Sequence, residues 1–137
     1  MEKNKLKLLF VFVVCIAVTT ACSLEKIKTT KTKDIDFTVV AESEMPSEVA
    51  QIVEQRKEKE NKMTYSDDQY TYIIIGYGKQ NYQGYSIKVK ELYETENAIY
   101  VKTQFDGPKE YASKQVETYP YIVIKIEQSD KNVIFSE

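Results

Sequence analysis

The stretch YTYIIIGYGKQNYQGYSIKV, residues 70–89, decides the fold. In its first six residues both alternating sets of side chains are nearly all apolar, a pattern typical of a strand covered on both faces. After Gly84, Tyr85, Ile87 and Val89 alternate with polar residues, as in a strand that has one face in water. The stretch therefore predicts a central strand over residues 70–75, a connection, and a half-buried strand that begins near Tyr85.

The connection between these two strands holds three of the four glycines in the chain, Gly76, Gly78 and Gly84. Glycine tolerates positive φ angles and close backbone approach, so one interpretation is a structural turn with a bulge. The other interpretation is a loop that contacts a partner, because loops often carry function and Tyr82 offers a large side chain with a polar tip. The sequence alone leaves both interpretations open.

Alternating apolar residues predict four further strands, over residues 35–40, 99–105, 121–126 and 133–135. In the first of these we expect Ile35, Phe37 and Val39 to be buried. The polar residues 94–97 predict a hairpin turn before the strand that begins at Ile99. In the strand opened by Tyr119-Pro120-Tyr121, the side chains of Ile122, Ile124 and Ile126 are expected to face inward.

One helix is predicted between the first and second strands. Pro46 suits a first helical turn, and Val49, Ile52 and Val53 recur at helical spacing, so the helix is expected from Pro46 to about Asn61. Residues 61–68 would connect it to the central strand. Six strands and one helix predict an α+β fold, either an antiparallel sheet that carries a helix or a small β-sandwich.

The first 21 residues have the pattern of an export signal. Lys3, Lys5 and Lys7 precede an apolar run of 11 residues, 8–18, and small residues follow at 19–21. The run is well short of the roughly 20 residues that a membrane-spanning helix needs. We therefore expect a cleaved signal peptide over residues 1–21.

Ala21-Cys22-Ser23 resembles the lipobox of bacterial lipoproteins, although Thr19 stands where that motif usually has a large aliphatic residue. Cys22 is the predicted lipidation site, and it fits better than Cys15, which lies within the apolar run. The alternative is an ordinary secretory signal that leaves Cys22 as a free thiol. Lipidation predicts a protein anchored in the bacterial cell membrane, on its extracytoplasmic face.

Residues 22–33 are predicted to be the lipidated cysteine followed by a solvated tether, and residues 34–137 to be one domain. Cleavage before Cys22 would leave 116 residues and remove three lysines and one glutamate from the 19 basic and 21 acidic residues, so the net charge becomes −4. Nucleic acid is therefore not an expected partner, because binding phosphates needs clustered basic residues.

Several catalytic and metal-binding arrangements are excluded by composition. The chain has no histidine, so Ser-His-Asp and Cys-His catalysis and histidine metal ligands are absent. Asp67 and Asp68 are neighbours and are best interpreted as a solvated turn. The glycines match no phosphate-binding loop. We therefore expect a protein that is not an enzyme and that uses no metal or cofactor.

From Ile35 to Phe135 the chain resembles the C-terminal domain of the PrcB family, named after a lipoprotein subunit of a bacterial cell-surface protease complex. The matching motifs are residues 72–78 (YIIIGYG), Gly84-Tyr85-Ser86-Ile87, Pro108, and Thr118-Tyr119-Pro120-Tyr121 with the isoleucines that follow. At Gln83 the family often has a second glycine. The resemblance implies a non-catalytic exported domain that binds and stabilises a partner protein, in the type case a protease.

The leading hypothesis is a tethered module that binds an extracytoplasmic protein, with a secreted or surface protease as one candidate. The alternatives are a protease inhibitor and, third, a small-ligand site between sheet and helix. Tyr85 is expected to pack toward the core, whereas Tyr77, Tyr82, Tyr111 and Tyr119 are expected to be exposed. The predicted partner-binding residues are Tyr77, Gly78, Tyr82, Gly84, Pro108, Tyr111 and Tyr119.

Overall fold

The computed structural model of the chain describes residues 30–136. The predicted signal peptide, Cys22 and most of the predicted tether lie outside the described residues. The elements, in chain order, are β1 (Lys33–Asp34), β2 (Thr38–Val39), the 3-10 helix η1 (Glu42–Glu44), α2 (Ser47–Arg56), β3 (Glu60–Ser66), β4 (Tyr70–Tyr77), β5 (Ser86–Glu94), β6 (Ala98–Asp106), β7 (Tyr121–Glu127) and β8 (Asn132–Ser136).

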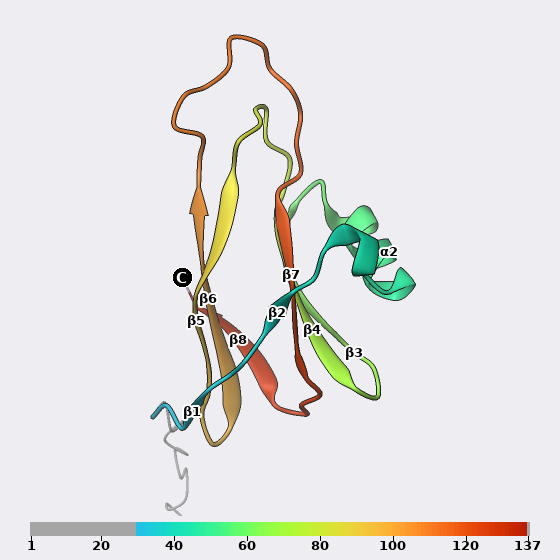
Figure 1. Cartoon of the computed structure of the whole chain (residues 1–137), viewed down its shortest axis with the longest axis vertical. Coiled ribbons are helices and arrows are strands. Elements are labelled where there is room, and N and C mark those ends of the chain that lie inside the picture. The colour runs from blue at the N-terminus through green and yellow to red at the C-terminus, as the bar shows by residue number, and fades with distance from the viewer. Residues whose placement is uncertain (1–29, 137) are drawn as a thin grey trace, which may run out of the picture.

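The strands form two sheets that pack face to face, with α2 outside one of them (Figure 1). Sheet A has the strand order β1-β5-β6-β8, and sheet B has the order β2-β7-β4-β3. Helix α2 lies on the outer face of sheet B. The layers are therefore sheet A, sheet B and the helix.

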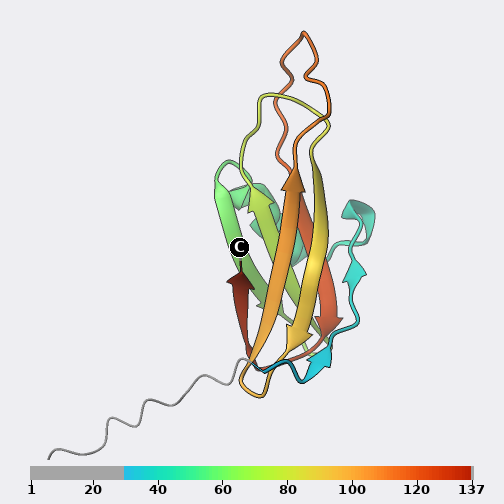
Figure 2. The same ribbon diagram turned by 90° about the vertical axis from the view of Figure 1, so that its left-hand side faces the viewer.

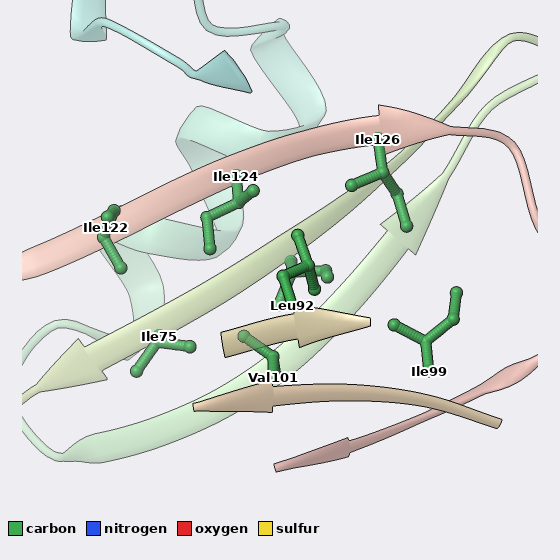
Figure 3. Close-up of a cluster of buried hydrophobic side chains, with 8 residues drawn as sticks. Ile75, Leu92, Ile99, Val101, Ile122, Ile124 and Ile126 are labelled. Carbon is green, nitrogen blue, oxygen red and sulfur yellow. The ribbon is translucent and has the colours of Figure 1, made fainter. Parts of the chain in front are cut away.

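The main core lies between the two sheets and consists of aliphatic side chains from both (Figure 3). Sheet B contributes residues of β4 and β7, and sheet A contributes residues of β5 and β6. The buried members are Ile73, Ile75, Ile122, Ile124, Ile126, Leu92, Ile99 and Val101. A second, smaller core holds α2 on sheet B and contains Val49, Val53, Tyr72, Ile74 and Val123.

Strand β4 is the central strand that the sequence predicted. It pairs with β3 on one side and with β7 on the other, antiparallel to both. Ile73 and Ile75 enter the main core, whereas Tyr72 and Ile74 enter the core beneath α2. The prediction of a strand covered on both faces is confirmed.

Strand β5 keeps the predicted alternation and forms the predicted hairpin with β6. Ile87 and Val89 pack against the main core, whereas Ser86, Lys88 and Lys90 are exposed. The pairing register shifts between Val89 and Glu91, which makes Lys90 the extra residue of a β-bulge.

Strand β7 carries the predicted inward isoleucines, and all three lie in the main core. After β7 the chain crosses from sheet B to sheet A, where β8 pairs with β6 in parallel. The other named strand pairs in the two sheets are antiparallel.

The predicted helix over residues 46–61 was too long. Helix α2 ends at Arg56, and β3 begins at Glu60 and pairs with β4 along its whole length. Beyond Val53 the sequence has no apolar residue at helical spacing that could hold a longer helix on sheet B. The predicted connection over residues 61–68 is therefore mostly strand.

The predicted first strand is divided between the two sheets. Strand β1 pairs with β5 in sheet A, whereas β2 pairs with β7 in sheet B, so the chain crosses between the sheets. The alternation is not kept across this crossing. As a result Phe37 and Val39, which were expected to be buried, are 42% and 53% exposed. Ile35 is partly buried against the main core, as expected.

The turn between β3 and β4 contains the adjacent carboxylates that the sequence assigned to a solvated turn. Both Asp67 and Asp68 are exposed. Asp67 Oδ1 accepts hydrogen bonds from the backbone N–H groups of Gln69 (2.8 Å) and Tyr70 (2.7 Å). These bonds lower the pKa of the Asp67 carboxyl below its ordinary value. The two carboxylates lie in a solvated turn, as predicted, and this turn joins the strands of the β3–β4 hairpin, which was not predicted.

The fold is therefore mostly β with one helix, as the sequence indicated. Of the two predicted alternatives, a single sheet that carries a helix and a small β-sandwich, the structure has the two-sheet form. The described residues contain eight strands instead of six, because β3 was not predicted and the first strand is split. The helix follows β2 and precedes β3.

Candidate functional site

Two loops lie side by side at the end of the sandwich opposite β1 (Figures 1 and 2). One joins β4 to β5 (residues 78–85), and the other joins β6 to β7 (residues 107–120); together they are called the loop end. Gln80 and Thr118 form an isolated antiparallel bridge, with N···O distances of 2.8 and 2.9 Å. The backbone N–H of Val116 also donates to the carbonyl of Asn81 (3.0 Å). The two loops therefore form one hydrogen-bonded unit.

Gly84 and Pro108, both predicted site residues, hold the two loops against each other. Gly84 has a φ of 93°, and a Cβ atom at this position would lie 2.9 Å from Cβ of Pro108. A larger residue would therefore be strained and would force the loops apart. In the structure, Gly84 and Pro108 let the two loops pack closely against each other.

Gly78, the third glycine of the predicted site, is buried at the start of the first loop. Its φ is 70°, and a Cβ atom there would lie 3.0 Å from the backbone nitrogen of Glu60 and 3.1 Å from the carbonyl carbon of Lys59. This glycine lets the loop pass close to the turn between α2 and β3.

An aromatic stack leads from the main core toward the loop end. Phe105 lies parallel to Tyr77 (ring centroids 4.1 Å apart) and to Tyr85 (5.1 Å). The Tyr77 hydroxyl shares a hydrogen bond of 2.5 Å with the hydroxyl of Thr103. Tyr77, expected to be exposed, is instead partly buried against the main core. Tyr85, expected to pack toward the core, is partly buried and stacks on Phe105, and desolvation raises the pKa of its hydroxyl.

Tyr82 and Tyr111 come together on the outside of the loop end. Their rings meet edge to face with centroids 4.9 Å apart. Tyr82 is partly buried: its carbonyl accepts a hydrogen bond from Thr118 Oγ1 (2.7 Å), and its hydroxyl accepts one from Gln115 Nε2 (3.3 Å). Tyr111 is 61% exposed, as predicted. This pair of tyrosines forms a partly exposed aromatic cluster on the loop end.

Tyr119 lies apart from this pair, on the side of the loop end near α2. Lys57 Nζ, just beyond α2, is 5.0 Å from the centroid of its ring. Burial and the nearby carboxylate of Glu58 raise the pKa of the Tyr119 hydroxyl. Lys79 and Glu117 form an ion pair of 2.5 Å beside it. The seven predicted site residues are therefore not one surface.

The site also contains residues that the sequence reasoning did not single out as functional. Phe105 orders two tyrosines, Thr118 and Gln115 fix Tyr82, and Val116 is an exposed apolar residue in a polar loop. Val116 had a detectable signal, as the one aliphatic residue larger than alanine between Gly107 and Thr118. Thr118 belongs to the motif of residues 118–121, but its bond to Tyr82 depends on which loop lies opposite, so the motif did not indicate this role.

The ion pair between Lys79 and Glu117 gives a testable pH dependence. The Lys79 ammonium donates to the Glu117 carboxyl and lowers its pKa below the ordinary 4.5. The pair therefore stabilises the folded protein above pH 4.5, and this contribution is lost as the pH falls through the lower folded pKa. Lys79→Met should raise the Glu117 pKa toward 4.5, as measured by NMR titration of the carboxyl carbon.

The control for this titration is Lys109→Met, which removes another lysine of the loop end. It should leave the Glu117 pKa unchanged. An unaltered Glu117 titration in Lys79→Met would show that the ion pair does not persist in solution.

Within residues 30–136, no group of three or more Asp, Glu or Cys side chains is placed to hold a metal ion. In the same part of the chain, no helix is both long and apolar enough to span a membrane.

Fold and site define a small mostly-β sandwich with one helix and an ordered aromatic loop end. Residues 71–127 match the model of the family described as PrcB C-terminal, so the predicted resemblance to that family is confirmed over this region. The matched region runs from β4 through β7 and contains both loops of the loop end. No curated protein and no solved structure matches the chain significantly.

Proposed function

We propose that this protein is a non-catalytic lipoprotein, anchored through Cys22 on the extracytoplasmic face of the cell membrane, that binds a partner protein with its loop end. The observation that supports this most is the exposed Tyr111 packed on Tyr82, on two loops that hydrogen bonds hold together. Aromatic side chains of this kind are enriched among the residues that dominate binding energy. A secreted or surface protease is one candidate partner.

The position of the loop end suits a tethered binding domain. Strand β1, which follows the predicted tether directly, pairs with the end of β5 that lies away from the loop end. Residues 32 and 33 of the predicted tether bond to Glu94 of β5, so a flexible tether could extend to about residue 31, and it would hold the domain on the order of 20 Å from the membrane. With the anchor at that end, Tyr111 can point away from the lipid surface.

The fixed conformation of the two loops also favours binding. A flexible loop loses conformational entropy when a partner fixes it, and that cost weakens the complex. Here the bridge between Gln80 and Thr118 and the bond from Thr118 to Tyr82 already fix both loops. Rigid tyrosines on ordered loops supply contact area at a low entropic cost.

Photo-crosslinking in the native membrane tests the binding surface. A photoreactive phenylalanine at position 111 should capture one specific protein. The matched control is the same residue at position 134, since Ile134 is also exposed but lies on sheet A. Equal capture at both positions, or none at position 111, would contradict the proposal.

Tyr111→Ala should weaken the complex with the captured protein about tenfold or more, because truncation of a central aromatic residue commonly costs more than 1 kcal/mol. The affinity can be measured by surface plasmon resonance. Tyr100→Ala, which removes a tyrosine from the middle of sheet A, should leave the affinity unchanged. If both variants bind with the wild-type affinity, the loop end is not the interface.

Two further measurements test the anchor and the effect of this protein on a protease partner. Mass spectrometry of the membrane fraction should find Cys22 acylated, and Cys22→Ser should release the protein from the membrane. If the partner is a protease, its half-life and its activity should be measured with and without this protein. A longer half-life favours the stabilising role, whereas lower activity at an unchanged half-life favours the inhibitory alternative.

A further inference from the structure

A hollow of about 580 Å³ lies beside β5, at the β1 end of the sandwich and away from the loop end. Its volume is within the roughly 300–1,000 Å³ typical of small-molecule sites. Its apolar lining comes from the crossing segment between β1 and β2 and from the end of β5, and it consists of Ile35, Phe37, Leu92 and Tyr93. The proposed partner-binding surface uses none of these residues.

Phe37 is the first unusual feature of this hollow. It lies where the chain crosses from sheet A to sheet B, and 42% of its surface is exposed. Leu92, by contrast, is buried in the main core. The hollow therefore has a floor supported by the core and a phenyl ring on its wall that the fold itself does not bury.

Lys90 is the second unusual feature. It is the extra residue of the β5 bulge, and bulges commonly redirect a side chain near a functional site. The other nearby cations are engaged: Lys31 Nζ lies 2.6 Å from Asp34, and Lys88 Nζ lies 3.5 Å from Asp106. Among the described residues, no ion pair involves Lys90. Its positive charge stabilises the charged form of the Asp106 carboxyl by electrostatic attraction alone.

Two carboxylates also line the hollow, and both lie near other cations. Asp34 is paired with Lys31, and Glu91 lies opposite Lys102 across the β5–β6 pair. Lys90 is therefore the cation of this hollow that remains for a ligand. An anion on an apolar body would match Lys90 and Phe37 together.

We propose that this hollow is a binding site for a small amphipathic anion, a carboxylate carried on an aryl or alkyl body. The carboxylate pairs with Lys90, and the apolar body packs on Phe37 above Leu92. This site is independent of the partner-binding surface at the loop end. It also differs from a site between sheet and helix, because it lies at the edge of sheet A.

Binding can be tested with three probes that share one body, namely 4-phenylbutyrate, 4-phenylbutan-1-ol and 4-phenylbutylammonium. The full chain is held in neutral phosphatidylcholine nanodiscs, and saturation-transfer NMR measures each probe against empty nanodiscs. The acid should bind about fivefold more tightly than the alcohol, as expected for one exposed ion pair, and the ammonium should bind most weakly.

Substitutions at Lys90 and Phe37 test the two proposed contacts, one with the carboxylate and one with the apolar body. Lys90→Gln should weaken binding of the acid about fivefold and leave the alcohol unchanged, whereas Lys90→Arg should keep the affinity for the acid. Phe37→Ser should weaken both probes about tenfold. The matched control Lys88→Gln removes a lysine two residues away on the same strand and should change neither affinity.

Three results would overturn the proposal. They are the absence of saturable binding of the acid up to about 10 mM, equal affinities for acid and alcohol, and equal effects of Lys90→Gln and Lys88→Gln. Because Lys90 and Phe37 are both exposed, the variants should retain the wild-type melting temperature, and a lowered Tm would identify a variant whose fold has changed.

Discussion

Replacing Ile73 by alanine should lower the free energy of unfolding by about 2–5 kcal/mol, the range that large-to-small changes in a packed core produce. Ile73 is fully buried, stands at the middle of the central strand β4, and lies opposite Ile124 of β7. Truncation leaves a cavity between the sheets that rigid neighbouring strands can only partly fill. Urea denaturation followed by far-UV circular dichroism measures the loss as a lower midpoint at an unchanged m-value.

The control is Ile134→Ala, which makes the same chemical change on β8. Ile134 is 38% exposed, so its truncation should cost less than about 1 kcal/mol. If the two variants lost equal stability, the main core would not lie between the two sheets as described.

Gly78→Ala should lower the free energy of unfolding by about 2–4 kcal/mol. Two costs combine, because an L-residue at a φ of 70° is strained by roughly 1–2 kcal/mol and the new methyl group overpacks a buried site. The nearest atoms are backbone atoms of Lys59 and Glu60, which cannot move aside as a side chain can. The loss can be measured by the same denaturation experiment.

Gly107→Ala is the matched control for this substitution. Gly107 starts the other loop, its φ is not positive, and the nearest atoms to an added Cβ would be at ordinary contact distances of 3.4 and 3.7 Å. Its effect should stay within about 0.5 kcal/mol. A similar loss in both variants would mean that the turn after α2 does not press against Gly78.

The parts of the fold that the sequence predicted are those with either a continuous apolar run or a strong period of two. Strand β4 is apolar on both faces and was identified as central, and the alternation in β5 and the isoleucines of β7 placed their inward faces correctly. In these segments burial alone specifies which side chains point inward. Local pattern and tertiary structure agree there.

Strand β3 was missed because its signal competes with a helical one. Residues 54–60 are rich in strong helix formers, and intrinsic propensity favours continuing the helix through them. The structure instead ends α2 at Arg56, where Asn61 Nδ2 donates a hydrogen bond of 3.0 Å to the Arg56 carbonyl. Met63 and Tyr65 then alternate toward α2, and that two-residue period was the available signal.

The candidate site was predicted in part, and the reason is geometric. The glycines correctly marked a shaped loop, but the sequence does not say that Gly84 meets Pro108 or that Tyr119 turns toward Lys57. Tyr77 was misplaced because its inward direction depends on Phe105, which is 28 positions further along the chain. Contacts between distant segments carry no local pattern.

The parallel pairing of β8 with β6 has a consequence for the order in which the chain can fold. Sheet A takes its two edge strands from the earliest and latest described segments, residues 33–34 and 132–136. Sheet B and the β5–β6 hairpin need only residues up to 127. Sheet A thus stays unfinished until residues 132–136 have been synthesised, and its completion depends on pairing each edge strand with a strand that is distant in the sequence, β1 with β5 and β8 with β6.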